Sequence, residues 1–216
     1  MKNKRSSIQG LHVIGVLILA AFWVAPVFGE TVIEAWDQVK IPPAPKIQTV
    51  EADSSRTMLL LLDFNKQVCN NERRPRCISS IPAVEKLALR ARNAGVPVVY
   101  SLTIGSRIGD VAPALAAKPG ERSVTSGPDK FIGTDLENIL KTSGVTTVIV
   151  TGTAAHGAVL YTASGAAFRG CKVIVPVDGI SAEGLYPEQY TVWHLLNAPR
   201  LSGQVTITRT DLISFR

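Results

Sequence analysis

The sequence predicts an α/β fold: a three-layer α/β/α sandwich with a mostly parallel sheet of five or six strands between two layers of helices. Two observations lead to this prediction. Five short apolar segments, each of strand length, recur along the chain with helical patterns between them. Most of these segments are continuous apolar runs, which is typical of strands buried on both faces of a parallel sheet.

The first strand and helix follow from the segment between residues 57 and 102. TMLLLLD at 57–63 is the first expected strand, and it ends in an acid. Ser80 and Pro82 open an expected helix that runs to Gly95, a residue suited to follow a helix end. VPVVYSL at 96–102 is the second expected strand.

A short strand and a short helix are expected next. ERSVT at 121–125 has the composition of a strand. In GTDLENILKTSG, Thr134 and Glu137 have the spacing of a capping box, and Gly144 is a stop signal. The sequence therefore predicts a helix between Thr134 and Gly144.

Three further strands complete the expected sheet, at 146–152, 171–178 and 203–209. Helical patterns lie between them at 154–170 and 187–197. Strands that alternate with helices in this way pair in parallel, with the helices covering both faces. Ligands of such sheets bind at the carboxyl ends of the strands.

The amino terminus has the features of an export signal. Three basic residues within the first five positions precede an apolar stretch at 11–28, and small residues stand at Val27 and Gly29. This pattern predicts that residues 1–29 are a cleaved signal peptide, that the protein is periplasmic or secreted, and that it does not insert stably into a membrane after cleavage. The alternative is an uncleaved anchor, because about 17–25 apolar residues span a bilayer.

The remaining chain divides into an arm and a domain. Residues 30–56 contain IPPAPK and few apolar repeats, so we expect an extended N-terminal arm before a domain at 57–216. Of 23 basic residues three lie in the predicted signal, so 20 basic residues face 17 acidic ones in the rest. This scattered surplus argues against nucleic acid as a partner.

The cysteines predict one disulfide. Cys69 and Cys77 flank the polar segment NNERRPR, and closing so short a loop costs little entropy. An oxidising compartment permits the bond, and the alternative is two free thiols. No CxxC pair or nearby histidine supplies a zinc ligand set, and we expect neither a metal nor another cofactor.

Three segments carry a resemblance to a known family. LLLDFN at 60–65, DKFIGTDLENIL at 129–140 and VIVTGTAAHGAVLYTASGAAFRGCKVIVPVD at 148–178 resemble the isochorismatase-like hydrolases of the cysteine hydrolase superfamily. The resemblance covers about residues 57–209. It implies a Rossmann-like fold and a small-molecule substrate or ligand, and it leaves assembly into homo-oligomers open.

The family's cysteine enzymes use an Asp–Lys–Cys triad, and Asp63 matches the aspartate. The residues agree, because a carboxylate after four leucines is not placed there for burial alone. The alternative is a structural aspartate. At the cysteine position this chain has Ala158, and Cys171 lies about a helix length away at the start of the next strand.

True isochorismatases also have a small residue in place of that cysteine, and they rely on acid–base chemistry by the aspartate. The turn containing His156 and Gly157 resembles theirs, which implies that His156 contacts substrate or moves a proton. The alternative is a turn histidine bonded to the backbone. The amides around Gly157 and Ala158 are expected to form an anion site. The resemblance also implies a cis peptide at Thr153–Ala154.

The lysine of the triad departs from the family pattern. The family lysine precedes, by about six residues, a phenylalanine that matches Phe131, but here the lysine is Lys130. Lys130 either reaches the same cavity or lies on the surface. Asn65 stands near the position of an isochorismatase glutamine, so Asn65 and Phe131 are expected to contact substrate.

Two functions remain open at this stage. The first is an exported hydrolase that acts on a small polar molecule with Asp63 as acid and base, without a cysteine nucleophile. The second is a pseudoenzyme that kept the fold as a small-molecule-binding or protein-interaction module. The segment SLTIGSRIGD lacks the histidines of nicotinamidases, so their metal site is not expected.

Overall fold

The computed structural model describes residues 29–216, so the predicted signal peptide lies almost entirely outside the described residues. Ala44–Arg216 forms one compact unit. Residues 29–43 belong to a separate unit, in which a single 3₁₀ turn spans Trp36–Gln38. Among residues 29–216, no helix is long and apolar enough to cross a membrane.

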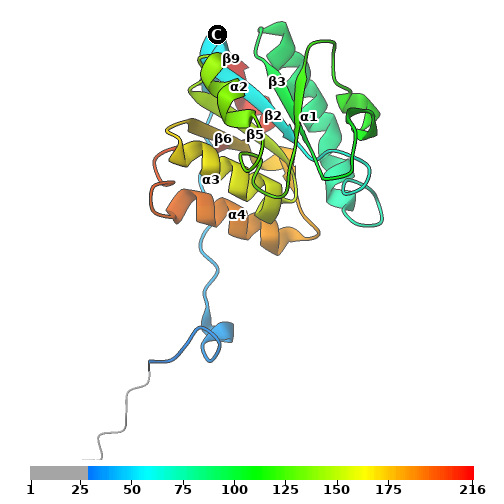
Figure 1. Ribbon diagram of the computed structural model, residues 1–216. Helices are drawn as coiled ribbons and strands as arrows, with labels where there is room; N and C mark the ends of the chain where they lie inside the picture. The colour runs from blue at the N-terminus through cyan, green and yellow to red at the C-terminus, as the bar shows by residue number, and fades with distance from the viewer. Residues whose placement is uncertain (1–28) are drawn as a thin grey trace, which may run out of the picture. The chain divides into compact units, whose positions relative to one another are not determined.

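A parallel sheet of seven strands forms the centre of the compact unit (Figure 1). Six strands form the continuous order β4-β3-β2-β5-β6-β8, and the two-residue strand β7 pairs with β5. The strands are β2 (Thr57–Leu62), β3 (Val98–Leu102), β4 (Arg122–Thr125), β5 (Thr147–Thr153), β6 (Lys172–Pro176), β7 (Ile180–Ser181) and β8 (Val205–Thr208). Every pair is parallel, which confirms the predicted sheet.

A second, two-stranded sheet joins the two ends of the compact unit. Strand β1 (Val50–Ala52), from the segment expected to be an extended arm, pairs in parallel with β9 (Ile213–Phe215). The last carbonyl of the chain, on Arg216, accepts a hydrogen bond from the Ser54 amide. The first and last segments of the unit are therefore held side by side.

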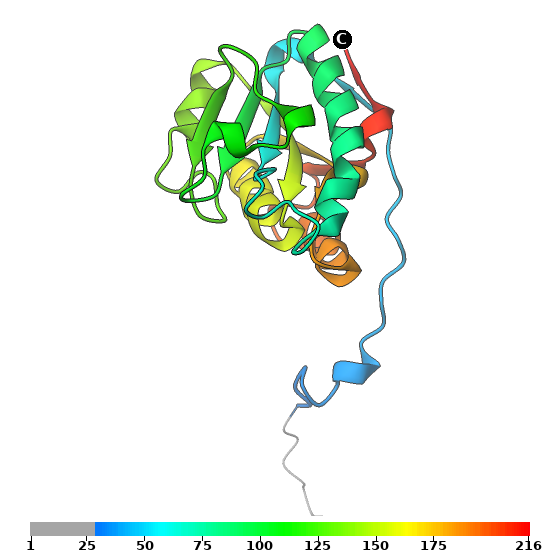
Figure 2. The same ribbon diagram turned by 90° about the vertical axis from the view of Figure 1, so that its right-hand side faces the viewer.

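Four helices cover the two faces of the large sheet (Figures 1 and 2). They are α1 (Pro75–Asn93), α2 (Leu136–Thr142), α3 (Leu160–Phe168) and α4 (Leu185–Asn197). The side chains of β2 alternate between the faces: Leu59 and Leu61 lie in the cluster with α1, whereas Leu60 and Leu62 lie in the cluster with α2 and α3.

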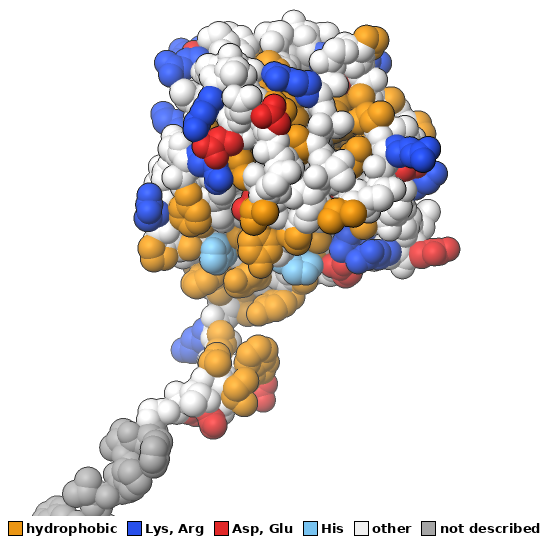
Figure 3. Space-filling view, in the orientation of Figure 1, with side chains coloured by type: hydrophobic (Ala, Val, Ile, Leu, Met, Phe, Trp, Pro, Cys, Tyr) orange, Lys and Arg blue, Asp and Glu red, His pale blue; other side chains and the backbone are white. Residues whose placement is uncertain are grey.

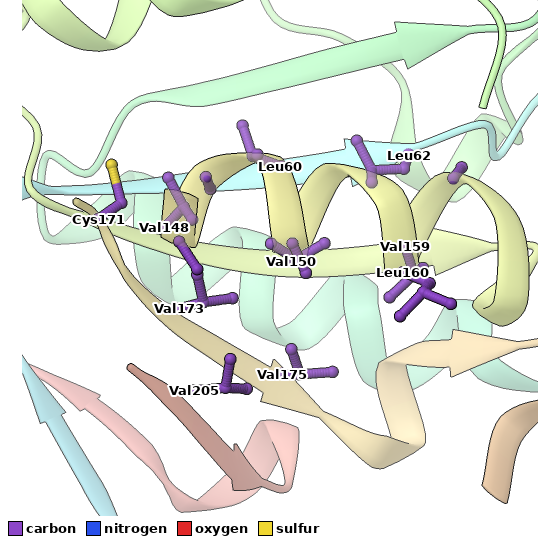
Figure 4. Packing of buried hydrophobic residues seen from close by; sticks show 14 of the residues in the cluster. Leu60, Leu62, Val148, Val150, Val159, Leu160, Cys171, Val173, Val175 and Val205 are labelled. Carbon is purple, nitrogen blue, oxygen red and sulfur yellow. The ribbon is translucent and has the colours of Figure 1, made fainter. Parts of the chain in front are cut away.

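The helices therefore form one layer on each side of the sheet, and the predicted three-layer architecture is confirmed. Figure 4 shows the second cluster, where Val148 and Val150 of β5 pack with Leu160 of α3. All six residues of β2 are buried, as its continuous apolar run predicted.

Two predicted helix starts were wrong. Helix α1 begins at Pro75 rather than near Ser80, and Pro82 lies inside it. Pro75 occupies the first turn, where the missing N–H of proline costs no hydrogen bond. Pro75, and not Pro82, is therefore the proline that marks the start of the helix. In α2 the capping box does not form, because the Glu137 carboxylate pairs with lysine and arginine side chains instead.

The predicted disulfide between Cys69 and Cys77 is present, and Cys171 is free and buried. The bond joins the loop after β2 to the first turn of α1.

Strands β2 and β5 approach each other closely at their carboxyl ends. Gly152 has a φ of 138°, and a Cβ there would lie 2.2 Å from the carbonyl oxygen of Leu62. Only glycine fits this position, so β2 and β5 end side by side with Asp63 immediately beyond.

Candidate active site

The order of the strands reverses between β2 and β5. From β2 the chain continues outward to β3 and β4, whereas from β5 it continues the other way to β6 and β8. The carboxyl edge at such a reversal is where ligands bind in open α/β sheets. A cavity of about 250 Å³ lies at this edge.

The cavity has a polar part and a part lined by small or apolar residues. The polar lining is Asp63, Arg74, Thr103, Ser126, Lys130 and Thr153. The remaining lining is Val68, Ile104, Gly127, Pro128, Ala154, Gly157 and Ala158.

Asp63 and Lys130 form a buried ion pair in this cavity. The Lys130 ammonium lies 2.7 Å from Asp63 Oδ2, and Ser101 Oγ donates to Asp63 Oδ1 at 2.8 Å. Lys130 is only 1% exposed, so it reaches the cavity and does not lie on the surface. The two oxygens of the Asp63 carboxylate therefore have different partners, a cation on one side and a hydroxyl on the other.

The backbone directs each member of the pair. Asp63 follows β2 with a φ of 56°, a left-handed conformation that aspartate tolerates better than most residues and that turns the chain away from the strand. Ser126 compacts the loop after β4, because its hydroxyl donates to the carbonyls of Asp129 and Ile132. The Lys130 ammonium also donates to the Ser126 carbonyl at 3.3 Å.

Burial raises the pKa of the Asp63 carboxyl above its usual range. The charge and hydrogen bond of Lys130 oppose this rise, as do the hydroxyl of Ser101 and the charge of Arg74. The carboxyl therefore holds a proton to a higher pH than an exposed aspartate would. A raised pKa suits a group that donates a proton near neutral pH.

The turn after β5 contains Ala158, the residue that the resemblance aligns with the nucleophile of cysteine hydrolases. Ala158 lines the cavity from a five-residue π-helical turn at Ala155–Val159. The peptide between Thr153 and Ala154 is cis, as the resemblance predicted. Cys171 begins the next strand region and is not among the residues that line the cavity.

The expected anion site on the amides of this turn is only partly available. The Gly157 amide donates to the Ala154 carbonyl at 3.0 Å, so it is already bonded within the turn. The Gly157 amide therefore already has a partner within the turn, and its part in an anion site stays a prediction.

Three other candidates, Asn65, Phe131 and His156, do not line the cavity. Asn65 is fully buried and its amide donates to Gln67, Thr103 and Ser106, of which Thr103 lines the cavity. Phe131 packs into the core, and the guanidinium carbon of Arg169 lies 4.2 Å from the centre of the Phe131 ring.

His156 is exposed on the turn after β5. It lies within electrostatic range of Glu183, the partner of Arg74. His156 therefore stands near the rim of the cavity and is not part of its lining.

Sequence reasoning missed Arg74 and Ser101. Arg74 lies in the polar segment between the two cysteines, which reads as a solvated loop, yet its side chain is 9% exposed. Ser101 is a hydroxyl in an otherwise apolar strand end, at the register position opposite Leu62. A polar residue at the carboxyl end of a buried strand was the signal available for Ser101.

Within the described residues no group of three or more histidine, cysteine, aspartate or glutamate side chains is arranged to hold a metal ion. The polar side chains of the cavity are instead one carboxylate, two cations and three hydroxyls. These groups can move protons and bind polar ligands.

Comparison with known proteins places this geometry in a family. The isochorismatase domain model matches residues 57–209, which include every strand of the large sheet. The chain belongs to the isochorismatase family. It is also 28% identical over 141 residues to the secreted isochorismatase effector Isc1 of Verticillium dahliae, a match that covers 60% of this chain and 74% of that protein.

Solved structures of the family share the fold. A cysteine hydrolase from Pseudomonas syringae pv. phaseolicola superposes with a TM-score of 0.67 at 20% identity, covering 78% of this chain and 94% of that one. N-carbamoylsarcosine amidase from Thermoplasma acidophilum superposes with a TM-score of 0.61 at 23% identity, covering 72% and 97% respectively. At these identities the likeness is one of fold.

Proposed function

We propose that this protein is an exported isochorismatase-family hydrolase that acts on a small polar molecule through Asp63, without a cysteine nucleophile. One observation carries the proposal: Asp63 and Lys130 lie 2.7 Å apart in an accessible cavity whose nucleophile position is Ala158. A site of this kind can transfer a proton, but it offers no thiol to form an acyl-enzyme intermediate.

Enol-ether hydrolysis fits these groups. Protonated Asp63 donates its proton to the terminal carbon of the enol ether, and a lone pair of the ether oxygen stabilises the oxocarbenium cation that results. Water then adds to that cation and loses a proton to the Asp63 carboxylate, and the hemiketal collapses to a ketone and an alcohol. Lys130 stabilises the Asp63 carboxylate while it is charged.

Export is supported by two independent features. The chain begins with a basic and apolar segment of the signal-peptide type, and the compact unit contains a disulfide, which persists in oxidising compartments. The similarity to a secreted effector agrees with this location.

Isochorismate is the first substrate to test, because the family model and the Verticillium relative both carry its name. Asp63→Asn keeps the shape of the side chain but cannot deliver a proton. Turnover should therefore fall by roughly 10²–10⁴, the usual contribution of general acid–base catalysis. Release of the keto acid, followed by NMR, measures the rate.

A binding module without activity is the second candidate, and the methyl group of Ala158 at the nucleophile position favours it. Calorimetric titration of the wild type and of Asp63→Asn separates the two functions. Binding of isochorismate without turnover by the wild type would identify a binding module. Full turnover by Asp63→Asn would contradict the mechanism.

A further inference from the structure

Arg74 neither donates nor accepts the proton of the proposed reaction, although it is one of the two cations that line the cavity. Arg74 as a whole residue is 7% exposed, and so low an exposure is rare for an arginine outside a binding site or a buried ion pair. A buried guanidinium needs acceptors for its five N–H groups, because unpaired buried donors are costly.

Glu183 satisfies only part of this need. The Nε and Nη2 atoms of Arg74 both approach the same oxygen, Glu183 Oε1, at 2.8 and 2.6 Å. Among the described residues, Nη1 makes no hydrogen bond, and since it is not one of the buried atoms without a partner, it is open to solvent or to a ligand. The Glu183 side chain is 46% exposed and does not line the cavity.

The backbone of Arg74 is held in place. The Arg74 amide donates to the Asn70 carbonyl, and the Cys77 amide donates to the Arg74 carbonyl, both at 2.9 Å. The disulfide between Cys69 and Cys77 closes the same loop. The guanidinium is therefore presented to the cavity from a fixed support, as pre-organised binding requires.

Both cations of the cavity have a carboxylate partner, but the partner of Arg74, Glu183, lies outside the cavity lining, whereas the partner of Lys130, Asp63, lies inside it. An anion in the cavity would therefore meet Arg74 without a carboxylate between them. The Lys130 ammonium pairs with Asp63 Oδ2 at 2.7 Å, and Ser101 donates to Asp63 Oδ1. Both oxygens of the Asp63 carboxylate therefore have partners other than Arg74. A carboxylate on a ligand would accept from the free edge of the guanidinium, the geometry that arginine recognises best.

We infer that Arg74 binds a carboxylate of the ligand and sets the preference of this cavity for anionic molecules. The inference rests on the proposed function for the cavity being a substrate site. Glu183 orients the guanidinium from outside, so that the substrate carboxylate and the bond to be protonated lie between Arg74 and Asp63.

The test compares a carboxylate with its neutral isostere. Benzoate and benzamide differ in charge and hardly in shape, and both are small enough for a cavity of about 250 Å³. We expect the wild type to bind benzoate at least about tenfold more tightly than benzamide, because hydrogen bonds to charged groups are the stronger ones. Calorimetric titration of the disulfide-bonded protein measures both.

Two arginine variants isolate the role of Arg74. Arg74→Gln should abolish the preference for benzoate, whereas Arg74→Lys should keep part of it. Arg76→Gln is the matched control, because Arg76 pairs with Glu188 from the same turn of α1 but does not line the cavity. Thermal unfolding of each variant checks that it is folded.

The outcomes separate this inference from the proposed function. Loss of the preference in Arg74→Gln and its retention in Arg76→Gln support the inference, even if the wild type hydrolyses no substrate. Equal binding of benzoate and benzamide, no binding of benzoate, or an equal loss in both variants would overturn it. Hydrolysis in the wild type would then leave the proposed function intact.

Discussion

The two sides of the cavity differ in what they contribute. On the side of β2, β3 and β4, three polar side chains from three elements form a closed network: Asp63, Ser101 and Lys130. On the side of β5, the turn at 153–159 contributes backbone and small side chains, among them Ala158. The first side contains a carboxyl group and a cation that can hold a proton, whereas the second contributes the Thr153 hydroxyl as its only polar side chain in the lining.

This difference separates two kinds of catalysis that share one fold. Covalent catalysis needs a nucleophile at the start of the helix after β5, whereas acid–base catalysis needs only a tuned carboxyl. If Ala158 occupies the family's cysteine position, as the resemblance implies, this chain lacks the first chemistry and keeps the groups for the second. The buried pair on the first side can be tested independently of any substrate.

Replacing Lys130 should produce the largest effect on stability. Lys130→Met leaves the Asp63 carboxylate buried without its cation, and removing one partner of a buried pair costs about 3–5 kcal/mol. Urea unfolding at pH 8 measures the loss.

The exposed pair of Lys141 and Glu137 provides the control, with side-chain exposures of 72% and 39%. Lys141→Met should cost little stability, because an ion pair exposed to water is weak. Equal losses in the two variants would show that the pair of Asp63 and Lys130 has no special energetic role, and the contrast between the two sides of the cavity would weaken.

The pH dependence of stability should reveal the raised pKa of Asp63. The unfolded chain binds fewer protons than the folded one between the ordinary pKa of aspartate and the raised pKa of Asp63, so stability falls as pH rises through this window. Asp63→Asn does not titrate. The free energy of unfolding of the wild type minus that of Asp63→Asn should therefore decrease as pH rises from below 3.8 through the folded pKa of Asp63.

The same proton governs activity. If Asp63 donates it, the rate of hydrolysis should also decline as pH rises through the folded pKa of this carboxyl. A difference in stability between the wild type and Asp63→Asn that increases with pH would mean that Lys130 outweighs burial, and that Asp63 is not held ready as an acid.

Ser101→Ala should have a smaller effect. The variant removes one hydrogen bond to the Asp63 carboxylate and leaves the ion pair with Lys130 in place. We expect a loss of about 1–2 kcal/mol in stability and a further rise in the pKa of Asp63. The pH–rate profile of Ser101→Ala should shift to higher pH, and an unshifted profile would exclude Ser101 from tuning the acid.

Much of the fold and part of the site followed from local patterns. The strands were predictable because a strand buried on both faces is a continuous apolar run, and Asp63 was predictable because it interrupts the end of one. Lys130 was identified by resemblance, but its reach into the cavity depends on how Ser126 folds the loop before it. The conformation of this loop cannot be predicted from the local sequence pattern.

Arg74 shows what sequence patterns leave out. Its segment is as polar as any surface loop, and its burial depends on a partner, Glu183, that is 109 positions away. Asn65 and Phe131 show the opposite case. The resemblance implied that both contact substrate, but both are buried and neither lines the cavity. In both cases the outcome is decided by which elements pack together, and this depends on the whole chain.

The smallest effect on turnover is expected from replacing Cys171, the free thiol among the described residues. Burial raises the pKa of the Cys171 thiol, so it is protonated near neutral pH and is a poor nucleophile. It packs with Val173 in the cluster that Figure 4 shows, away from the cavity lining. Cys171→Ser should therefore leave turnover within about twofold of the wild type, because it changes no group that reaches the substrate.

The variant also tests the assignment of Ala158 to the nucleophile position. A serine hydroxyl in this apolar surrounding should lower stability by about 1–3 kcal/mol if it finds no partner. Turnover must therefore be compared at a temperature where both proteins are folded. Loss of turnover under that condition would make Cys171 the nucleophile and would return this chain to the covalent chemistry of its cysteine-containing relatives. Unchanged turnover, together with a slow Asp63→Asn, would leave the carboxyl on the β2 side as the group that performs the reaction.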